Sequence, residues 1–190
     1  SSILLLVRNR TGYRNLCHLI SKGRLRYEKG TSKVSWTEVA EHQKGLFALW
    51  LNQGPVELLL EAFDNRLYGF ATRHRYYAEV PLEKNLREKA AKYNIPIVAG
   101  MEVLYHQGHR RAMQDVLTAL RHGVSLPTAG SILKPNAEFA LRSPTSFKKL
   151  YSDDLLSVSR TISISEQCNF SLEEIQYQYP VENLPNNITL

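Results

Sequence analysis

The sequence contains few cysteines: Cys17 and Cys168 are the only two among 190 residues, and they stand far apart. No CxxC pair occurs, so the sequence predicts neither a disulfide-stabilised scaffold nor a structural zinc site. Two unpaired thiols are typical of a protein in a reducing compartment. We therefore expect a cytoplasmic protein.

Long apolar runs are also missing from the sequence. No stretch approaches the ~20 residues that a membrane-spanning helix needs, so no membrane association is expected. The first apolar run, at residues 3–7, is shorter than a signal-peptide core of ~7–15 residues and lacks a cleavage pattern of small residues. The composition, 43% hydrophobic and 22% charged, is instead ordinary for a globular domain.

Several motifs of catalysis are absent as well. There is no GxSxG around a nucleophilic serine, and neither GxxxxGK[ST] nor GxGxxG is present to bind a phosphate. HxH and HExxH, two common arrangements of metal-binding histidines, are also missing. The sequence therefore gives little support to serine-hydrolase or nucleotide-binding chemistry.

The charge balance is basic, with a net charge of +6 and an isoelectric point near 9.3. Such a charge favours weak attraction to polyanions but does not by itself establish nucleic-acid binding. Two basic clusters are candidates for a nucleic-acid surface, and the first is interleaved with tyrosines as a stacking surface would be. Their arginines are Arg73, Arg75, Arg110 and Arg111. A solvated rim of charges is the alternative.

The remaining pattern alternates strands with helices. Apolar runs predict strands at residues 3–7, 45–51, 66–72 and 95–99. Each is followed by apolar residues at helical spacing, and a capping box that begins at Ser35 predicts a further short helix. This alternation predicts an α/β fold with parallel strands joined by right-handed crossovers.

The stretch at residues 95–123 is the part on which most of the functional interpretation depends. It reads as a buried strand, a polar loop and an amphipathic helix, whose apolar face consists of Met113, Val116, Leu117 and Leu120. In α/β proteins, sites are built from the loops that follow the carboxyl ends of the strands.

Metal ligands are the first possibility to consider at these strand ends. His74 follows one predicted strand, and the loop after the next contains Glu102, His106 and His109. Histidine and carboxylate ligands that converge from different strand ends are typical of metal-dependent hydrolases. Solvated loop histidines are the alternative, because a ligand set is usually recognisable by its type and spacing.

Three stretches together resemble one protein family. They are LLLVRNRTGYRNLCHLISKG (4–23), IPIVAGMEVLYHQGHRRAMQDVLTALRHG (95–123), and FALRSPTSFKKLYSDD with ISISEQCNFSLEEIQYQYP (139–180). They resemble the polymerase-and-histidinol-phosphatase (PHP) region of bacterial DNA polymerase III α subunits. RRAMQDVLTALRHG, the segment Pro135-Asn136-Ala137-Glu138 and CNFSLEEIQYQYP are similar to the error-prone branch of that family.

The resemblance implies a fold and a division of the chain. Residues 1–123 would form the later part of a distorted (β/α)7 PHP barrel. Residues 124–170 would form a loop and a short helical segment that leads toward the polymerase module, and residues 171–190 an extended tail. The first metal-binding motifs of the family would precede Ser1, and the carboxylates of polymerisation would lie beyond the chain.

One metal motif of the family should fall inside this chain, after the strand at 95–99. Intact members typically read Thr-Asn-Asp-Val-His-Tyr there, with the Asp and the His as ligands, whereas this chain reads Gly-Met-Glu-Val-Leu-Tyr. Glu102 keeps a carboxylate, but Leu104 cannot bind a metal. His74 falls where the family has an Arg-His pair after a strand. The resemblance therefore implies a degenerate site, and zinc or manganese is expected only if further ligands precede Ser1.

Three functional hypotheses follow. The first is a non-catalytic PHP segment of an error-prone DNA polymerase III α subunit, with a structural role in replication and translesion repair. Its partners would be the remainder of that subunit, DNA, or a second copy bound through exposed edge strands. The second is a metal-dependent phosphoesterase or 3′–5′ exonuclease that uses His74, Glu102, His106 and His109. The third is a basic nucleic-acid-binding module.

Overall fold

A computed structural model describes residues 1–175 of the chain. The strands are β1 (Ile3–Val7), β2 (Leu46–Trp50), β3 (Leu67–Thr72) and β4 (Ile97–Gly100). The α-helices are α1 (Arg10–Leu25), α2 (Trp36–Glu41), α3 (Val56–Phe63), α4 (Glu79–Lys92), α5 (Arg111–His122), α6 (Pro144–Leu150) and α7 (Leu155–Gln167). The predicted α/β class is confirmed. Most of the predicted extended tail, 176–190, lies outside the described residues.

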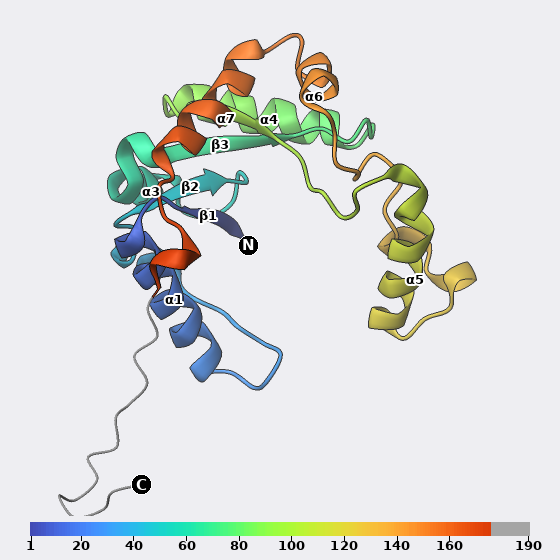
Figure 1. The fold of residues 1–190 in the computed structure, drawn as a ribbon, viewed down its shortest axis with the longest axis horizontal. Coiled ribbons are helices and arrows are strands. Elements are labelled where there is room, and N and C mark those ends of the chain that lie inside the picture. The colour runs from blue at the N-terminus through green and yellow to red at the C-terminus, as the bar shows by residue number, and fades with distance from the viewer. Residues whose placement is uncertain (176–190) are drawn as a thin grey trace, which may run out of the picture.

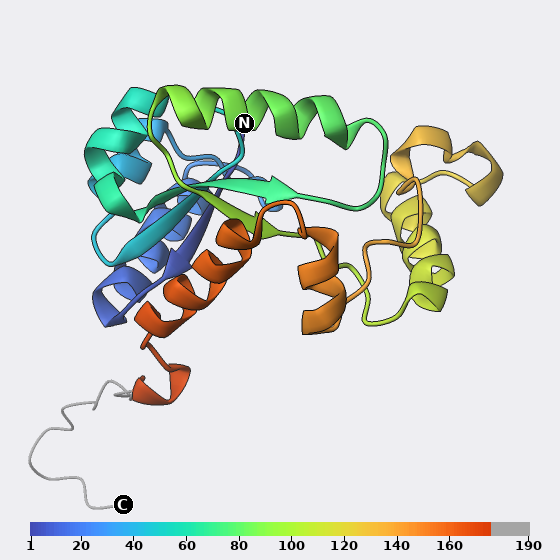
Figure 2. The same cartoon turned by 90° about the horizontal axis from the view of Figure 1, so that it is seen from above.

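Helices cover both faces of the sheet, which explains the unbroken apolar runs of the central strands. All five residues of β2 are buried. On one face, α1, α2, α3 and α4 pack against alternate strand residues in a core that includes Ala48, Leu67 and Ile97. On the other face, Ile164 of α7 packs with Phe47 and Val98. Figure 2 shows α4 and α7 on opposite sides of the strands. The result is a three-layer arrangement, as expected for strands that are apolar on both faces.

The prediction that all strands are parallel is wrong for β1. The sheet order is β1-β2-β3-β4, with β2, β3 and β4 parallel but β1 antiparallel to β2. The reason lies in the connection, which passes outward along α1 and returns through the loop and α2. The return brings the chain back to the end of β1, where the Arg8 amide donates to the Gly45 carbonyl at 2.9 Å. Because the chain runs away from the end of β1 along α1 and back to it through α2, β2 starts at that same end and runs antiparallel to β1. A single returning helix would have left the two strands parallel.

Local signals account for where the helices of this connection begin. Asn9 caps α1, since its side-chain oxygen accepts from the Gly12 amide at 3.1 Å. The capping box predicted at Ser35 is confirmed: its hydroxyl accepts from the Glu38 amide at 3.2 Å, and its own amide donates to the Glu38 carboxylate at 3.0 Å.

The sheet is open within residues 1–175, because β1 and β4 each have a neighbour on one side only. These two strands are therefore the free edges through which self-association was predicted. Within the same residues, no helix is long and apolar enough to cross a membrane.

The segment between β4 and α6 forms a lobe that lies away from the sheet, as Figures 1 and 2 both show. It contains α5 and a series of short 3-10 turns. The two connections of the lobe meet in a single parallel β-bridge between Tyr105 and Ala140. The chain then returns to the sheet through α6 and α7.

Candidate functional site at the carboxyl ends of β3 and β4

His74, which follows β3, is buried to 2% exposure and is held from all sides. Its Nδ1 lies 2.6 Å from a carboxylate oxygen of Glu79, and its backbone amide donates to the other oxygen at 2.6 Å. Its ring stacks on Phe139 with the centroids 4.0 Å apart. The side-chain amide of Asn136 donates to its carbonyl at 2.8 Å. This histidine thus joins the end of β3 to the start of α4 and to the lobe.

The second ring nitrogen of His74 also has a partner. Nε2 lies 2.9 Å from the backbone amide nitrogen of Glu102 and 3.1 Å from its carbonyl oxygen, so the Glu102 backbone contacts this nitrogen whichever ring nitrogen carries the proton. A metal ion at Nε2 would have to displace this backbone contact. His74 binds the end of β4 to the end of β3.

The polar contacts that Glu102 makes with His74 come from its backbone, whereas its side chain contacts Lys134. Its carboxylate accepts from Lys134 Nζ at 2.7 Å, and the same ammonium lies 4.6 Å from the centre of the Phe139 ring. The Glu102 side chain is half exposed. The sequence-predicted pair His74 and Glu102 is therefore brought together, but through the backbone of Glu102.

His106 and His109 lie in the loop before α5, with their ring centroids 6.3 Å apart and both side chains exposed. They do not join His74 in one group. Among residues 1–175, no three or more His, Cys, Asp or Glu side chains are placed to hold a metal ion. The described residues therefore do not by themselves supply a set of metal ligands.

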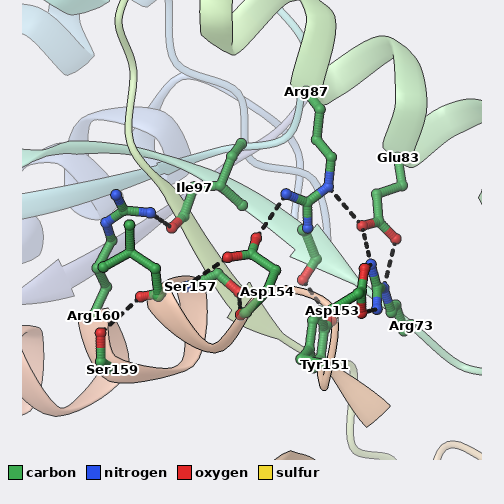
Figure 3. A network of polar contacts seen from close by, with 12 residues as sticks. Arg73, Glu83, Arg87, Ile97, Tyr151, Asp153, Asp154, Ser157, Ser159 and Arg160 are labelled. Atoms are coloured by element: carbon green, nitrogen blue, oxygen red, sulfur yellow. Dashed lines mark hydrogen bonds and ion pairs between the residues drawn. The ribbon is translucent and has the colours of Figure 1, made fainter.

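Arg73, the residue before His74, is the centre of an ion-pair network that Figure 3 shows. Its guanidinium donates to both oxygens of Glu83 on α4 at 2.7 and 2.8 Å, and to both oxygens of Asp153 at 2.6 and 2.8 Å. It also donates to the Leu150 carbonyl at 3.0 Å and lies 4.6 Å from the centre of the Tyr151 ring. Arg73 thus ties the end of α6 to the strand ends and to α4.

The network continues along α4 toward α7. Arg87 donates to Glu83 at 2.7 Å and to Asp154, the N-cap residue of α7, at 2.7 Å. Tyr151 is fully buried. Its hydroxyl oxygen lies 2.7 Å from the Gly100 carbonyl oxygen and 2.8 Å from the Ala71 carbonyl oxygen. These contacts place the α6–α7 segment over the ends of β3 and β4.

Electrostatics follow the geometry of this network. Hydrogen bonds from Arg73 lower the pKa of Asp153 to about 2. Burial acts to raise the pKa of Glu83, but hydrogen bonds from Arg73 and Arg87 outweigh it and the net pKa is lowered. For Tyr151, burial raises the pKa of the hydroxyl, which stays protonated as a donor. The carboxylates are therefore held in their charged form.

We expect acid to loosen this network. Because the pKa values of Glu83, Asp153 and Asp154 are lowered in the folded protein, their contribution to stability is complete above the unfolded values of about 4. It is lost as the pH falls from about 4 toward 2. Urea unfolding measured at successive pH values should show this decline, and Asp153→Asn should make it shallower. An identical decline in the variant would contradict the assignment.

The four arginines predicted to contact nucleic acid are not equivalent. Arg73 is occupied by the network, and Arg111 donates to the Lys134 carbonyl at 2.9 Å and lies 3.5 Å from the Asp115 carboxylate. Arg75 is more than half exposed, 3.7 Å from Glu138. It borders a surface groove of about 540 Å³ that Tyr76 also lines. Arg75 and the exposed Arg110 are the two whose charge faces solvent.

The acidic partners in this region were not identified from the sequence. Glu79, Glu83 and Arg87 recur at four-residue intervals and so form one stripe on the helix. That spacing, together with the Asp153-Asp154 pair before α7, is the signal that could have indicated a polar contact between helices.

The fold and the strand-end contacts define an α/β protein whose sheet carries a helical segment fixed across its carboxyl end. Comparison with known proteins shows which proteins the chain resembles. The chain is 36% identical over 188 residues to the error-prone DNA polymerase of Pseudomonas fluorescens (strain Pf0-1), and the match covers 96% of this chain. It is 35% identical over 187 residues to that of Pseudomonas aeruginosa, and 30% over 202 residues to that of Rhodopirellula baltica. The resemblance to error-prone DNA polymerases predicted from the motifs is confirmed.

The match covers only part of each relative. The chain spans 18% of the length of the two Pseudomonas proteins and 17% of the Rhodopirellula protein. No protein-family model matches the chain.

Proposed function

We propose that this chain is a PHP-type segment of a bacterial error-prone DNA polymerase III α subunit, with a structural and non-catalytic role in replication and translesion repair. The open sheet would be the later part of the PHP barrel, which strands outside these residues would close. The remainder of the subunit would be its partner and the cytoplasm its location. The similarity to error-prone DNA polymerases over 96% of the chain supports this proposal.

The observation that supports the non-catalytic role is the set of contacts made by the His74 ring nitrogens. It is the candidate ligand whose place after a strand matches the family pattern. Its Nδ1 faces Glu79, as in many metal-binding histidines, but Nε2, the nitrogen left for a metal, is already in contact with the Glu102 backbone. Ligation of a metal would require breaking a buried hydrogen bond and exposing a buried ring, which costs about 1–3 kcal/mol for each group left without its partner. A group fixed in this way suits a structural junction.

The rest of the motif supports the same proposal. Leu104, where intact members have a ligating histidine, offers no donor atom in its side chain. The Glu102 carboxylate is paired with Lys134. These two motif positions therefore offer a metal ion one paired carboxylate and no imidazole.

Substitution of Glu102 separates the two readings. Its side chain is half exposed and makes a surface ion pair, so Glu102→Ala is expected to cost less than about 1 kcal/mol in unfolding free energy. His74→Ala, in contrast, removes a buried junction and is expected to lower stability by about 3 kcal/mol. The measurements are urea unfolding, metal content by mass spectrometry, and 3′–5′ exonuclease and phosphatase assays with Mn²⁺ and Zn²⁺ on the natural polypeptide.

If the segment has a structural role, Glu102→Ala should leave any metal-dependent turnover in these assays unchanged. Stoichiometric zinc or manganese, with turnover that Glu102→Ala abolishes while the protein stays folded, would overturn the proposal in favour of the enzyme. Lys134→Ala is a matched control, because it removes the same ion pair without removing a carboxylate ligand.

The nucleic-acid-binding alternative is less well supported than it was by charge alone. Arg73 and Arg111 make internal contacts, which leaves Arg75 and Arg110 to carry a DNA contact. The groove beside Arg75 is lined by charges of both signs, with Glu79 and Glu88 among the carboxylates and Lys84 among the cations, so it is not a cationic phosphate site. We therefore place DNA contact second to the structural role.

A further inference from the structure

Helix α5 turns its apolar face away from the rest of the described chain. The predicted apolar face is present, but its members are 38–71% exposed: Met113, Val116, Leu117 and Leu120. Figure 1 shows α5 in the outlying lobe, far from the sheet. A surface helix of a globular protein normally buries such a stripe. This helix therefore lacks the surface that its sequence is built to meet.

The opposite face of α5, which packs against its own lobe, is polar. Arg111 donates to the Lys134 carbonyl at 2.9 Å and faces Asp115 at 3.5 Å. Asp115 Oδ1 and Arg111 Nε are both buried without a hydrogen-bond partner among the described residues. Of the residues of α5, only Ala119 is fully buried. Polar residues inward and apolar residues outward are the reverse of what this lobe alone would select.

We propose that the apolar face of α5, defined as Met113, Val116, Leu117 and Leu120, docks onto a part of the polymerase polypeptide that lies outside these 190 residues. This inference rests on the proposed function. The relatives that match 96% of this chain are more than five times as long, since the chain spans 18% of each Pseudomonas protein. A longer polypeptide thus supplies ample surface to cover the stripe.

Charge favours this occupant over a second copy of the chain. Arg110 precedes the helix, Arg121 lies in its last turn, and neither forms an ion pair within residues 1–175. Two copies paired face to face would bring these like charges together whether the helices ran parallel or antiparallel, which is unfavourable. The geometry points to an apolar surface edged by carboxylates.

Oxidation of Met113 by dilute peroxide tests the proposal, because a thioether reacts according to its accessibility. The experiment uses the complete natural polypeptide at a concentration where it is monomeric, with the rate at Met113 read by peptide mass spectrometry. Docking predicts oxidation roughly tenfold or more slower in the native protein than in urea. A native rate within about twofold of the denatured rate would overturn the proposal. So would a natural polypeptide no longer than these residues.

Two variants make the assignment specific. Leu117→Asp should restore fast oxidation of Met113, whereas Leu25→Asp, at an 87% exposed leucine at the end of α1, should leave it slow. Protection of Met113 that appears only as the protein associates would assign the face to a second copy and overturn the proposal. These outcomes are independent of metal content and nuclease activity, so the docking and the non-catalytic role fail separately.

Discussion

Gly12→Ala is expected to destabilise the protein by about 3 kcal/mol, although alanine is the better helix former. Gly12 lies inside α1, where the helix passes directly over the start of β2. A Cβ at Gly12 would lie 1.9 Å from the Gly45 carbonyl oxygen and 2.5 Å from its carbon. Because these are backbone atoms, the clash cannot be relieved by a rotamer change. The helix would have to move off the sheet.

A second glycine provides the control for this prediction. At Gly108 an added Cβ would meet Ala137 at 3.7 Å, an ordinary contact distance, so Gly108→Ala should stay within about 0.5 kcal/mol of the parent. Both variants are compared by urea unfolding at neutral pH. Equal stability of Gly12→Ala and the parent would show that α1 and β2 do not approach each other as closely as the structure has them.

The connection between β1 and β2 shows what the sequence could and could not predict about the sheet. The apolar runs of β2 and β4 indicated strands covered on both faces, because helices bury both sides. The direction of β1 was missed even though both helices between β1 and β2 were predicted. Two helices between two strands bring the chain back to the end of the sheet where the first strand finished. The number of helices in the connection, rather than the alternation of strands and helices, therefore determined the direction of β1.

The site shows a different limit of sequence reasoning. The pattern identified His74 and Glu102 as residues that follow adjacent strands, and the structure brings them together. It could not reveal that the Glu79 carboxylate and the Glu102 amide take both nitrogens of His74, since these contacts depend on how α4 and the β4 loop are placed. For α5 the helix was predicted, but its apolar face stays 38–71% exposed among the described residues.

Arg73→Met is expected to lower the unfolding free energy by about 3 kcal/mol. Methionine keeps most of the apolar length but removes every hydrogen bond to Glu83, Asp153 and the Leu150 carbonyl. Glu83 is the most consequential of these, because its side chain is only 13% exposed and would keep Arg87 as its one cationic partner. A largely buried carboxylate that loses one of its two cationic partners destabilises the folded protein.

Asp153→Asn is the matched control, since it removes the other end of the same network. The Asp153 side chain is 63% exposed, so solvent screens its charge and the expected cost is below about 1 kcal/mol. Urea unfolding compares the two variants, and trypsin digestion reports whether α6 and α7 leave the sheet. In Arg73→Met, cleavage should increase within α6, at Lys148 and Lys149, because the carbonyl that follows them has lost its donor. Equal costs for the two variants would mean that the Arg73 contacts are a surface feature and that Tyr151, the Arg87–Asp154 pair and the packing of α7 fix the helical segment across the strand ends.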